Sequence, residues 1–423
     1  MDRSIIDAVF LEQMEELELL RNEELIHRAE ESKINLDSKL AQVVIGVRRS
    51  GKSTLCFNAL EKAGVKYAYA NFDDERLEKM ESADLDQVLE SLYRLYGRFD
   101  YLFLDEIQNV SGWPLFVNRL LRQKLHLVIT GSNSKLLSSE LASHLTGRHH
   151  TIELFPFSFL DWCQLKHIEY QRLTAKARGL LAAAYDEYLR CGGFPELIFE
   201  GQSKDYVNTL FNDIIRQDIQ KRFKVRRIEE FRKMANIMLD EAPAFINKEQ
   251  LQNICGIQSD HTVNNYISYL TQTYLISQVS KYSAKSRQRV RNVKYYAIDV
   301  AFMDKRDNAF SGENLGWRLE TLVYLELRRR YSGDAMDVYY YKENQAEADF
   351  VVCEGNKTVA IYQVSYDMAS EKTRRREIRG CIAAAKETKC DNLFIITDHE
   401  HSDIESQGYK IAIRPAWQWL VEK

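Results

Sequence analysis

Short apolar runs alternate with stretches of helical periodicity over the first part of the chain. The apolar runs lie at residues 42–46, 67–71, 101–104 and 127–130, with 151–154 as a further candidate. Strands that alternate with helices indicate βαβ units and a parallel sheet. Continuously apolar strands such as YLFL and LVIT are typical of a sheet covered on both faces. The pattern predicts an α/β, doubly wound domain, preceded over residues 1–35 by one or two amphipathic helices.

The periodicity of apolar residues changes twice in the remainder of the chain. Residues 161–226 have helical periodicity that is broken at Gly192-Gly193, and residues 227–300 predict three short helices followed by a β-hairpin. Beyond residue 300 the predicted elements are helices at 316–331 and 370–386 and strands at 338–342, 348–353, 358–364 and 393–397. We therefore expect a helical region, a small helix-and-hairpin domain and a mixed α/β domain after the parallel sheet.

The strongest chemical signal is GVRRSGKS at residues 46–53, which matches G-x-x-x-x-G-K-[ST] between an apolar strand and a helical stretch. Glycines allow successive backbone N–H groups to form a concave site for phosphate oxygens, and the helix N-terminus adds positive potential. Lys52 is expected to reach the β- and γ-phosphates, and the Ser53 hydroxyl to ligate Mg²⁺. The expected nucleotide-binding residues of this motif are Gly46, Arg49, Ser50, Gly51, Lys52, Ser53 and Thr54.

The apolar run at 101–104 ends in two carboxylates, Asp105 and Glu106. An acid at the carboxyl end of a strand beside a P-loop lies where the metal-bound phosphates lie. Asp105 is expected to hold Mg²⁺ through water, and Glu106 to polarise the attacking water. An ordinary helix cap is the structural alternative for an isolated Asp-Glu pair, but the P-loop some 50 residues upstream favours nucleotide hydrolysis.

In this order the motifs resemble those of the AAA+ ATPases. The resemblance implies ATP as the nucleotide and a sensor 1 side chain at Ser132 or Asn133, between which the sequence does not choose. It also implies that Arg148, just before the fifth strand, is an arginine finger that reaches a neighbouring subunit's ATP site. The expected assembly is a homo-oligomer, either a ring such as a hexamer or a nucleotide-dependent assembly. GGFPE at 192–196 stands at the place of sensor 2 but contains no arginine.

A narrower set of segments is similar to bacterial and archaeal AAA ATPases that carry a C-terminal domain of unknown function, DUF4143. The segments are GVRRSGKST, NFDDER, FLDEIQNVSGW, TGSNSKLL, LTGR, LFPFSF and GGFPE. The resemblance runs from about residue 38 to the end of the chain. It implies N-terminal helices (1–35), an AAA+ core (36–160), a helical lid (161–226), a winged-helix-like domain (227–300) and a restriction-endonuclease-like mixed α/β domain (301–423).

Residues 247–275 predict two short helices separated by a turn at Gly256, as in a helix-turn-helix. Residues 281–294 follow with six basic residues and no acid, and alternate arginines project to one side of a strand. The candidate DNA contacts are Asn264, Lys285, Arg287, Arg289 and Arg291. The alternatives are a structural domain with a solvated basic hairpin, or a module that binds protein partners.

The last region resembles the PD-(D/E)xK nuclease fold, with Glu320 in a helix and Asp349 and Gln363 in two adjacent strands. In that fold such residues ligate a divalent metal, and a lysine two residues after the last ligand helps to position water. Ser365 stands at the place of that lysine, and the Gln363 side chain carries no charge. We therefore expect a degenerate site, unless a lysine such as Lys342 or Lys372 is supplied from elsewhere.

Composition limits the classes of protein that remain. The chain has 423 residues with 58 Lys+Arg and 62 Asp+Glu, so a net charge of −4 offers no whole-protein argument for nucleic acid binding. The sequence contains no apolar run of about 18 residues, and its start is acidic and mixed, so neither a membrane span nor a signal peptide is expected. Seven scattered cysteines without a CxxC pair indicate reduced thiols and a cytoplasmic location.

These observations together predict an ATP-binding and ATP-hydrolysing AAA+ protein that uses Mg²⁺ and couples turnover to DNA binding, remodelling or translocation. A first alternative is an ATP-dependent switch that acts on protein partners. A second alternative is an ATP-gated nuclease, against which Ser365 argues.

Overall fold

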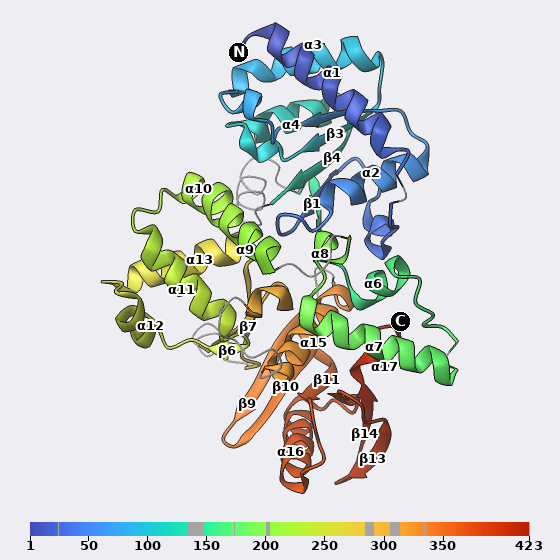
Figure 1. Ribbon diagram of the computed structural model, residues 1–423, viewed down its shortest axis with the longest axis vertical. Coiled ribbons are helices and arrows are strands. Elements are labelled where there is room, and N and C mark those ends of the chain that lie inside the picture. Colours follow the sequence, from blue (N-terminus) through green and yellow to red (C-terminus); the bar gives the residue numbers. More distant parts are fainter. Residues whose placement is uncertain are drawn as a thin grey trace. The chain divides into compact units, whose positions relative to one another are not determined.

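The computed structural model describes residues 1–23, 25–132, 147–172, 174–199, 204–283, 292–304, 314–332 and 336–422. It divides into two compact units (Figure 1). The first unit comprises residues 1–154 together with 272–274, and the second comprises residues 155–271 and 275–423.

The first unit is built on a five-stranded sheet. Its strands are β1 (Ala41–Ile45), β2 (Tyr67–Asn71), β3 (Tyr101–Asp105), β4 (His126–Gly131) and β5 (His149–Glu153). All neighbouring strands are parallel, in the order β2-β3-β4-β1-β5. The predicted parallel α/β fold is therefore confirmed. Because β4 lies between β1 and β3, its carboxyl end lies between the P-loop and the two acids that follow β3.

Helices cover both faces of this sheet. They are α1 (Arg3–Leu20), α2 (Lys52–Ala63), α3 (Leu85–Tyr96) and α4 (Trp113–Arg122), with short 3₁₀ turns at Ala29–Lys33, Glu75–Leu77, Ser82–Asp84 and Ile107–Asn109. Right-handed crossovers place α2 on one face and α3 and α4 on the other. The face under α2 forms a core in which Leu55 and Leu60 pack with Val44, Phe103 and Val128.

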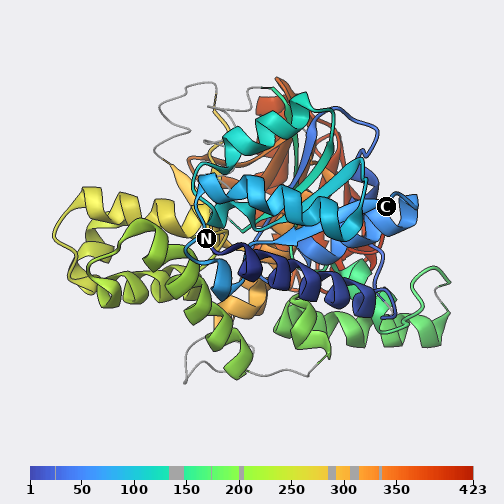
Figure 2. The ribbon, with the colours of Figure 1, turned by 90° about the horizontal axis from the view of Figure 1, so that it is seen from above.

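The N-terminal helix α1 lies beside α3 and closes the β2 edge of the sheet (Figures 1 and 2). The buried Gln13 side chain donates to the Asn71 carbonyl and accepts from the Asn71 N–H, both at 2.9 Å. An amide side chain thus replaces a further strand at this point, which leaves less of the edge open to intermolecular pairing.

The first half of the second unit is mainly helical. Its helices are α6 (Phe159–Leu165), α7 (Ala175–Cys191), α8 (Pro195–Phe199), α9 (Lys204–Asp213), a π-helical turn (Ile214–Gln220), α10 (Lys221–Phe223), α11 (Ile228–Asp240), α12 (Lys248–Cys255) and α13 (Asp260–Gln272). The strands β6 (Ala244–Phe245), β7 (Ile276–Ser280) and β8 (Val293–Ala297) form an antiparallel sheet in the order β6-β8-β7. The three predicted helices and the hairpin between residues 227 and 300 are present.

The C-terminal part of the second unit contains a six-stranded mixed sheet in the order β13-β14-β12-β11-β10-β9. The strands are β9 (Met336–Glu343), β10 (Ala346–Glu354), β11 (Lys357–Ser365), β12 (Leu393–Thr397), β13 (Ser402–Ser406) and β14 (Tyr409–Pro415). The accompanying helices are α15 (Leu315–Arg330), α16 (Glu371–Thr388) and α17 (Ala416–Trp419), and a 3₁₀ turn spans Val300–Asp304. The predicted mixed α/β domain is confirmed, whereas β13, β14 and α17 were not predicted.

The two long helices of this domain cover opposite faces of the mixed sheet. Cys381 and Ala385 of α16 pack in a core with Ile361 of β11. On the other face, the Tyr324 ring of α15 stacks on Phe350 of β10, with centroids 6.0 Å apart. Among the described residues, no helix is both long enough and apolar enough to cross a membrane.

Candidate functional site

The P-loop joins β1 to α2 and has the backbone that a phosphate-binding loop requires. Gly51, directly before α2, has a φ of 85°, a left-handed conformation that favours glycine. A Cβ added at Gly46 would lie 2.1 Å from the Leu154 carbonyl oxygen, so this position has no room for a side chain. The sequence folds here into a tight loop whose N–H groups precede a helix N-terminus.

The buried Lys52 side chain connects the loop to the second motif. Its ammonium donates to the Val47 carbonyl at 3.1 Å and lies 3.6 Å from Glu106 Oε1. The structure therefore brings Lys52 and Glu106 together at the carboxyl edge of the sheet, although 54 positions of sequence separate them.

Asp105 is buried at the end of β3 and is held by hydroxyl groups. The Thr130 hydroxyl donates to Oδ1, the Tyr69 hydroxyl donates to Oδ2 at 3.1 Å, and the Ser53 hydroxyl is also hydrogen-bonded to this carboxylate. Burial, and then the neighbouring Glu106 carboxylate, raise the pKa of Asp105 above its usual value. A bound cation would favour the charged form, so this carboxylate suits a metal-binding role.

Glu106 has a φ of 50°, an uncommon conformation for a residue with a side chain. Its N–H donates to Thr130 Oγ1 at 3.1 Å, and its carboxylate accepts from Ser132 N–H at 3.3 Å and from the Gln108 amide. Strained residues held by several partners gather at functional sites. Residues at the ends of β3 and β4 thus fix the backbone and the carboxylate of Glu106 in one position.

Sequence reasoning missed three residues of this site: Tyr69, Thr130 and Gln108. Thr130 contacts both acids because β4 lies beside β3 in the sheet, with Leu104 opposite Ile129. The sequence does place Thr130 at the end of an apolar run, where a site residue could lie. Only the strand order, which is known from the fold, shows that this end lies beside Asp105 and Glu106. Ser132 is buried beside Glu106, whereas Asn133 lies outside the described residues.

The NFDDER segment, at residues 71–76, is attached to both nucleotide motifs. Arg48 of the P-loop pairs with Asp73 at 3.1 Å. The Asn109 amide, in the turn after Glu106, donates to the Phe72 carbonyl at 3.2 Å. Side-chain contacts therefore join the P-loop, the NFDDER segment and the turn after Glu106 at the carboxyl ends of the strands. The NFDDER segment thus helps to hold the two nucleotide motifs in place.

ATP with Mg²⁺ fits the residues that are present. The P-loop supplies a cradle too narrow for a side chain at Gly46, and Lys52 supplies a cation. The Ser50 hydroxyl is buried without a hydrogen-bond partner among the described residues, so it is able to donate to a phosphate oxygen. Ser53 and Asp105 supply the hard oxygen ligands that Mg²⁺ prefers.

Arg148 is exposed at the amino end of β5, where its guanidinium donates to Asn118 Oδ1 at 3.0 Å. His149 is opposite Ala41, the first residue of β1, whereas the P-loop follows the last residue of that strand. Strand β1 thus separates Arg148 from its own P-loop by roughly 16 Å. The arginine therefore lies at the amino ends of the parallel strands, whereas its own nucleotide site lies at their carboxyl ends.

The GGFPE segment is a backbone junction within the second unit. Phe157 N–H donates to the Gly193 carbonyl at 2.7 Å, and a Cβ at Gly193 would lie 2.1 Å from the Phe157 carbonyl oxygen. The buried Asp299 carboxylate accepts from Gly193 N–H at 2.9 Å. The Arg318 guanidinium of α15 donates to the Arg190 carbonyl at the end of α7 at 2.9 Å. The close approach of Phe157 and the hydrogen bond to Asp299 explain why position 193 is a glycine, and neither requires a nucleotide.

The DNA-contact candidates are only partly described. Asn264 is exposed on α13 and accepts from the Lys248 ammonium at 2.7 Å. The other candidates, Lys285, Arg287, Arg289 and Arg291, lie outside the described residues. At the ends of the same basic segment, Lys281 pairs with Glu343 at 2.8 Å and Lys294 pairs with Glu320 at 2.6 Å.

The nuclease-like residues lie close together in the second unit. Asp349 N–H donates to Gln363 Oε1 at 3.2 Å, and Lys294 contacts Glu320 and, at 3.7 Å, Asp349. Lys294 was not expected here, because it belongs to β8 and precedes Glu320 by 26 positions. The two alternative lysines lie elsewhere: Lys342 pairs with Glu347 at 2.8 Å, and Lys372 is exposed on α16.

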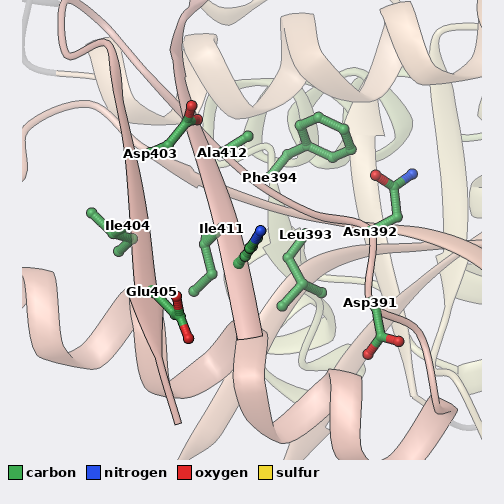
Figure 3. Close-up of a pocket in the computed structure, with 10 residues that line it drawn as sticks. Asp391, Asn392, Leu393, Phe394, Asp403, Ile404, Glu405, Ile411 and Ala412 are labelled. Carbon is green, nitrogen blue, oxygen red and sulfur yellow. The ribbon is translucent and has the colours of Figure 1, made fainter. Parts of the chain in front are cut away.

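A hollow of about 530 Å³ lies on the C-terminal sheet (Figure 3). Side chains of β12, β13 and β14 line it, with Leu393 and Ile411 among its apolar members and Asp403 and Glu405 among its acids. None of the predicted site residues lines this hollow, and its acidic side chains do not suit a phosphate group.

Three family models match the chain. An AAA domain matches residues 38–163, a domain of unknown function (DUF8612) matches residues 182–309, and a domain of unknown function (DUF4143) matches residues 315–415. The resemblance to AAA proteins with a C-terminal DUF4143 domain is thereby confirmed.

Two curated relatives match over most of their length. An uncharacterized protein of Methanocaldococcus jannaschii is 31% identical over 424 residues, which cover 96% of this chain and 93% of the relative. An uncharacterized protein of Haemophilus influenzae is 29% identical over 348 residues, which cover 78% of this chain and 84% of the relative.

Solved structures with similarity include the Thermotoga maritima RuvB Holliday junction branch migration motor. It has a TM-score of 0.29 and 16% identity, covering 63% of this chain and 88% of RuvB. The structure of Drosophila ORC bound to AT-rich DNA and Cdc6 has a TM-score of 0.21 and 10% identity, covering 64% of this chain and 86% of that chain. Similarity of this size carries no argument about function.

Proposed function

Because this chain belongs to the family of AAA-domain proteins that end in a DUF4143 domain, we propose that it binds ATP with Mg²⁺ and hydrolyses it to ADP and phosphate. The observation that carries the proposal is the convergence of Lys52, Asp105 and Glu106 at the carboxyl edge of the parallel sheet, next to a P-loop. A cation and two acids at this edge of an α/β sheet suit phosphoryl transfer.

Each side chain has a separate task in this proposal. The P-loop N–H groups and Lys52 hold the phosphates, and Ser53 and Asp105 hold Mg²⁺, which when bound neutralises phosphate charge. Glu106 accepts the proton of the attacking water. Gln108, Thr130 and Ser132 N–H are positioning groups, because they hold the Glu106 carboxylate or backbone.

The test separates nucleotide binding from hydrolysis. We expect Glu106→Gln to bind ATP like the wild type but to turn it over about 10²–10⁴ times more slowly, because the amide cannot accept the proton. Lys52→Ala should lose binding as well. Glu90→Gln, at an exposed ion pair on α3, is the matched control and should leave both unchanged. Unimpaired turnover by Glu106→Gln would refute the proposal.

We further propose that Arg148 completes the ATP site of a neighbouring chain in a homo-oligomer. The support is its exposed position at the opposite edge of the sheet from its own P-loop. Arg148→Ala should therefore retain ATP binding and lose about 10²–10³-fold in turnover. An equal loss of ATP affinity would instead indicate that Arg148 acts on the fold of its own chain.

For the output of ATP turnover we propose contact with DNA through the basic segment at residues 281–294. Two of its six cations are already paired with acids, so the argument concerns Lys285, Arg287, Arg289 and Arg291. We expect DNA to stimulate turnover in a salt-sensitive manner, and alanine at these four positions to remove the effect. Lys357→Ala, an exposed lysine on β11, is the control. Turnover indifferent to DNA would favour the switch that acts on protein partners.

A further inference from the structure

The cluster around Glu320 and Asp349 contains a cation supplied by the chain itself. Lys294 Nζ lies 2.6 Å from Glu320 Oε1 and 3.7 Å from Asp349 Oδ1. The three side chains are only 7%, 13% and 9% exposed. Tyr296, two residues along β8, donates its hydroxyl to the same Glu320 oxygen at 2.6 Å.

The resemblance to nucleases implies a divalent metal at these residues, but the arrangement does not fit one. Asp349 Oδ2 accepts from Val364 N–H at 2.9 Å. Gln363 Oε1 accepts from Asp349 N–H, and its amide donates to Glu377 at 2.7 Å. Among the described residues, no group of three or more His, Cys, Asp or Glu side chains could hold a metal. Lys294 and Tyr296 thus already contact Glu320 Oε1, and Val364 N–H already contacts Asp349 Oδ2, where a metal would need free oxygens.

The electrostatics of the cluster favour the ammonium. Burial alone disfavours a charged lysine, but the carboxylates of Glu320 and Asp349 outweigh it and raise the pKa of Lys294 above its ordinary value. Burial and then Glu320 also raise the pKa of Asp349. A buried carboxylate needs either a proton or a neighbouring cation, and Lys294 of β8 supplies the cation beside Glu320.

Further contacts fasten the β7–β8 hairpin to the edge of the C-terminal sheet. Tyr282 N–H donates to the Tyr340 carbonyl at 2.7 Å, and the Tyr340 hydroxyl donates to the Asn292 carbonyl at 3.2 Å. Lys281 pairs with Glu343 of β9. The basic segment between β7 and β8 is therefore bound at both ends to the domain that carries Glu320 and Asp349.

We propose that the Lys294 ammonium is a tethered cation that takes the place of a divalent metal between Glu320 and Asp349. The cluster then fastens the basic hairpin to the C-terminal domain, and it does not support metal-dependent cleavage of a phosphodiester. This inference is independent of the proposed ATPase site, which lies in the first unit.

The first experiment replaces the cation in the full chain. In Lys294→Met, the buried acids Glu320 and Asp349 lose the cation that lies between them, so the melting temperature should fall by about 6–20 °C. Millimolar Mn²⁺ should recover part of that loss, and electron paramagnetic resonance should count one more bound Mn²⁺ per chain than in the wild type. Arg375→Met, at an ion pair with Glu371 whose side chains are 78% and 68% exposed, is the control and should change little.

A second variant tests the same cluster where Lys294→Met does not fold. Lys294→Met/Glu320→Gln/Asp349→Asn removes the cation and both charges, so it should melt near the wild type and should not respond to Mn²⁺. A triple variant that melts as low as Lys294→Met, or a Lys294→Met protein with wild-type stability and no added Mn²⁺ site, would refute the tethered cation.

The nuclease alternative has its own readout. We expect wild-type protein with Mg²⁺ or Mn²⁺ to leave supercoiled plasmid DNA intact, with and without ATP. Metal-dependent nicking that Lys294→Met and Asp349→Asn both abolish would overturn the proposal, since Lys294 would then be an active-site lysine.

Discussion

The contact between Gly193 and Phe157 supports a prediction about why the GGFPE segment needs its glycines. A methyl group at Gly193 would place its carbon 2.1 Å from the Phe157 carbonyl oxygen, well inside van der Waals distance. The two backbones must then separate, which also lengthens the 2.7 Å hydrogen bond from Phe157 N–H to the Gly193 carbonyl. Overpacking costs about 1–3 kcal/mol and the lost hydrogen bond about 1 kcal/mol.

We therefore expect Gly193→Ala to reduce the unfolding free energy of the second unit by about 2–4 kcal/mol. For a unit of this size the melting temperature should fall by roughly 4–16 °C. Gly179→Ala is a matched control in α7, where an added Cβ has nothing within 4 Å. Because alanine favours a helix over glycine, the control should gain about 0.5–1 kcal/mol.

The assay is thermal and urea unfolding followed by tryptophan fluorescence. Trp113 is the single tryptophan in residues 1–154, so a Trp113→Phe background confines the signal to the second unit. Stability of Gly193→Ala equal to that of the wild type would refute the steric argument. If Gly193→Ala instead lost ATP turnover at unchanged stability, the GGFPE segment would act on the nucleotide, as a sensor 2 motif does.

Three further predictions follow from single contacts. Thr130→Val removes the hydroxyl that joins Asp105 to Glu106 N–H, so ATP turnover should fall about tenfold or more; unchanged kcat would contradict this. Burial raises the pKa of Asp299 to about 6, so its folded state binds the proton more tightly than the unfolded state. Unfolding free energy in urea should then decrease by up to about 3 kcal/mol as pH rises from about 4 to 6 and level off above, a dependence that Asp299→Asn should lack. Gln13→Ala removes two hydrogen bonds to the β2 edge and should cost the first unit about 1–3 kcal/mol, measured by Trp113 fluorescence; unaltered stability would show that the edge needs no cap.

The strands of the first unit were predictable because each is a continuous apolar run bounded by polar residues. The P-loop and the Asp105-Glu106 pair were predictable because their chemistry lies in consecutive residues. Strand β14 also carried a usable signal, since buried Ile411 and Ile413 alternate with the more exposed Lys410 and Arg414. Strand β13 (SDIES) contains a single apolar residue, Ile404, and gave no such signal.

The residues that sequence reasoning missed depend on contacts between distant segments. Thr130 reaches both acids only because β4 is inserted between β1 and β3. Lys294 belongs to the basic segment that we expected to contact DNA or, alternatively, to be solvated, yet its strand places it beside a pair of buried acids in the following domain. Gly193 marked a motif whose meaning depends on Phe157 and Asp299, each more than 30 positions away. Periodicity and local motifs contain no information of this kind.

The most direct test of the central claim mixes two inactive proteins. Glu106→Gln lacks the base but keeps Arg148, and Arg148→Ala keeps the base but lacks the arginine. If the ATP site of one chain is completed by Arg148 of its neighbour, random co-assembly restores turnover to about a quarter of the wild-type value per chain. Turnover of the mixture no higher than the sum of its separate components would contradict hydrolysis by Glu106 with an arginine supplied from a second chain.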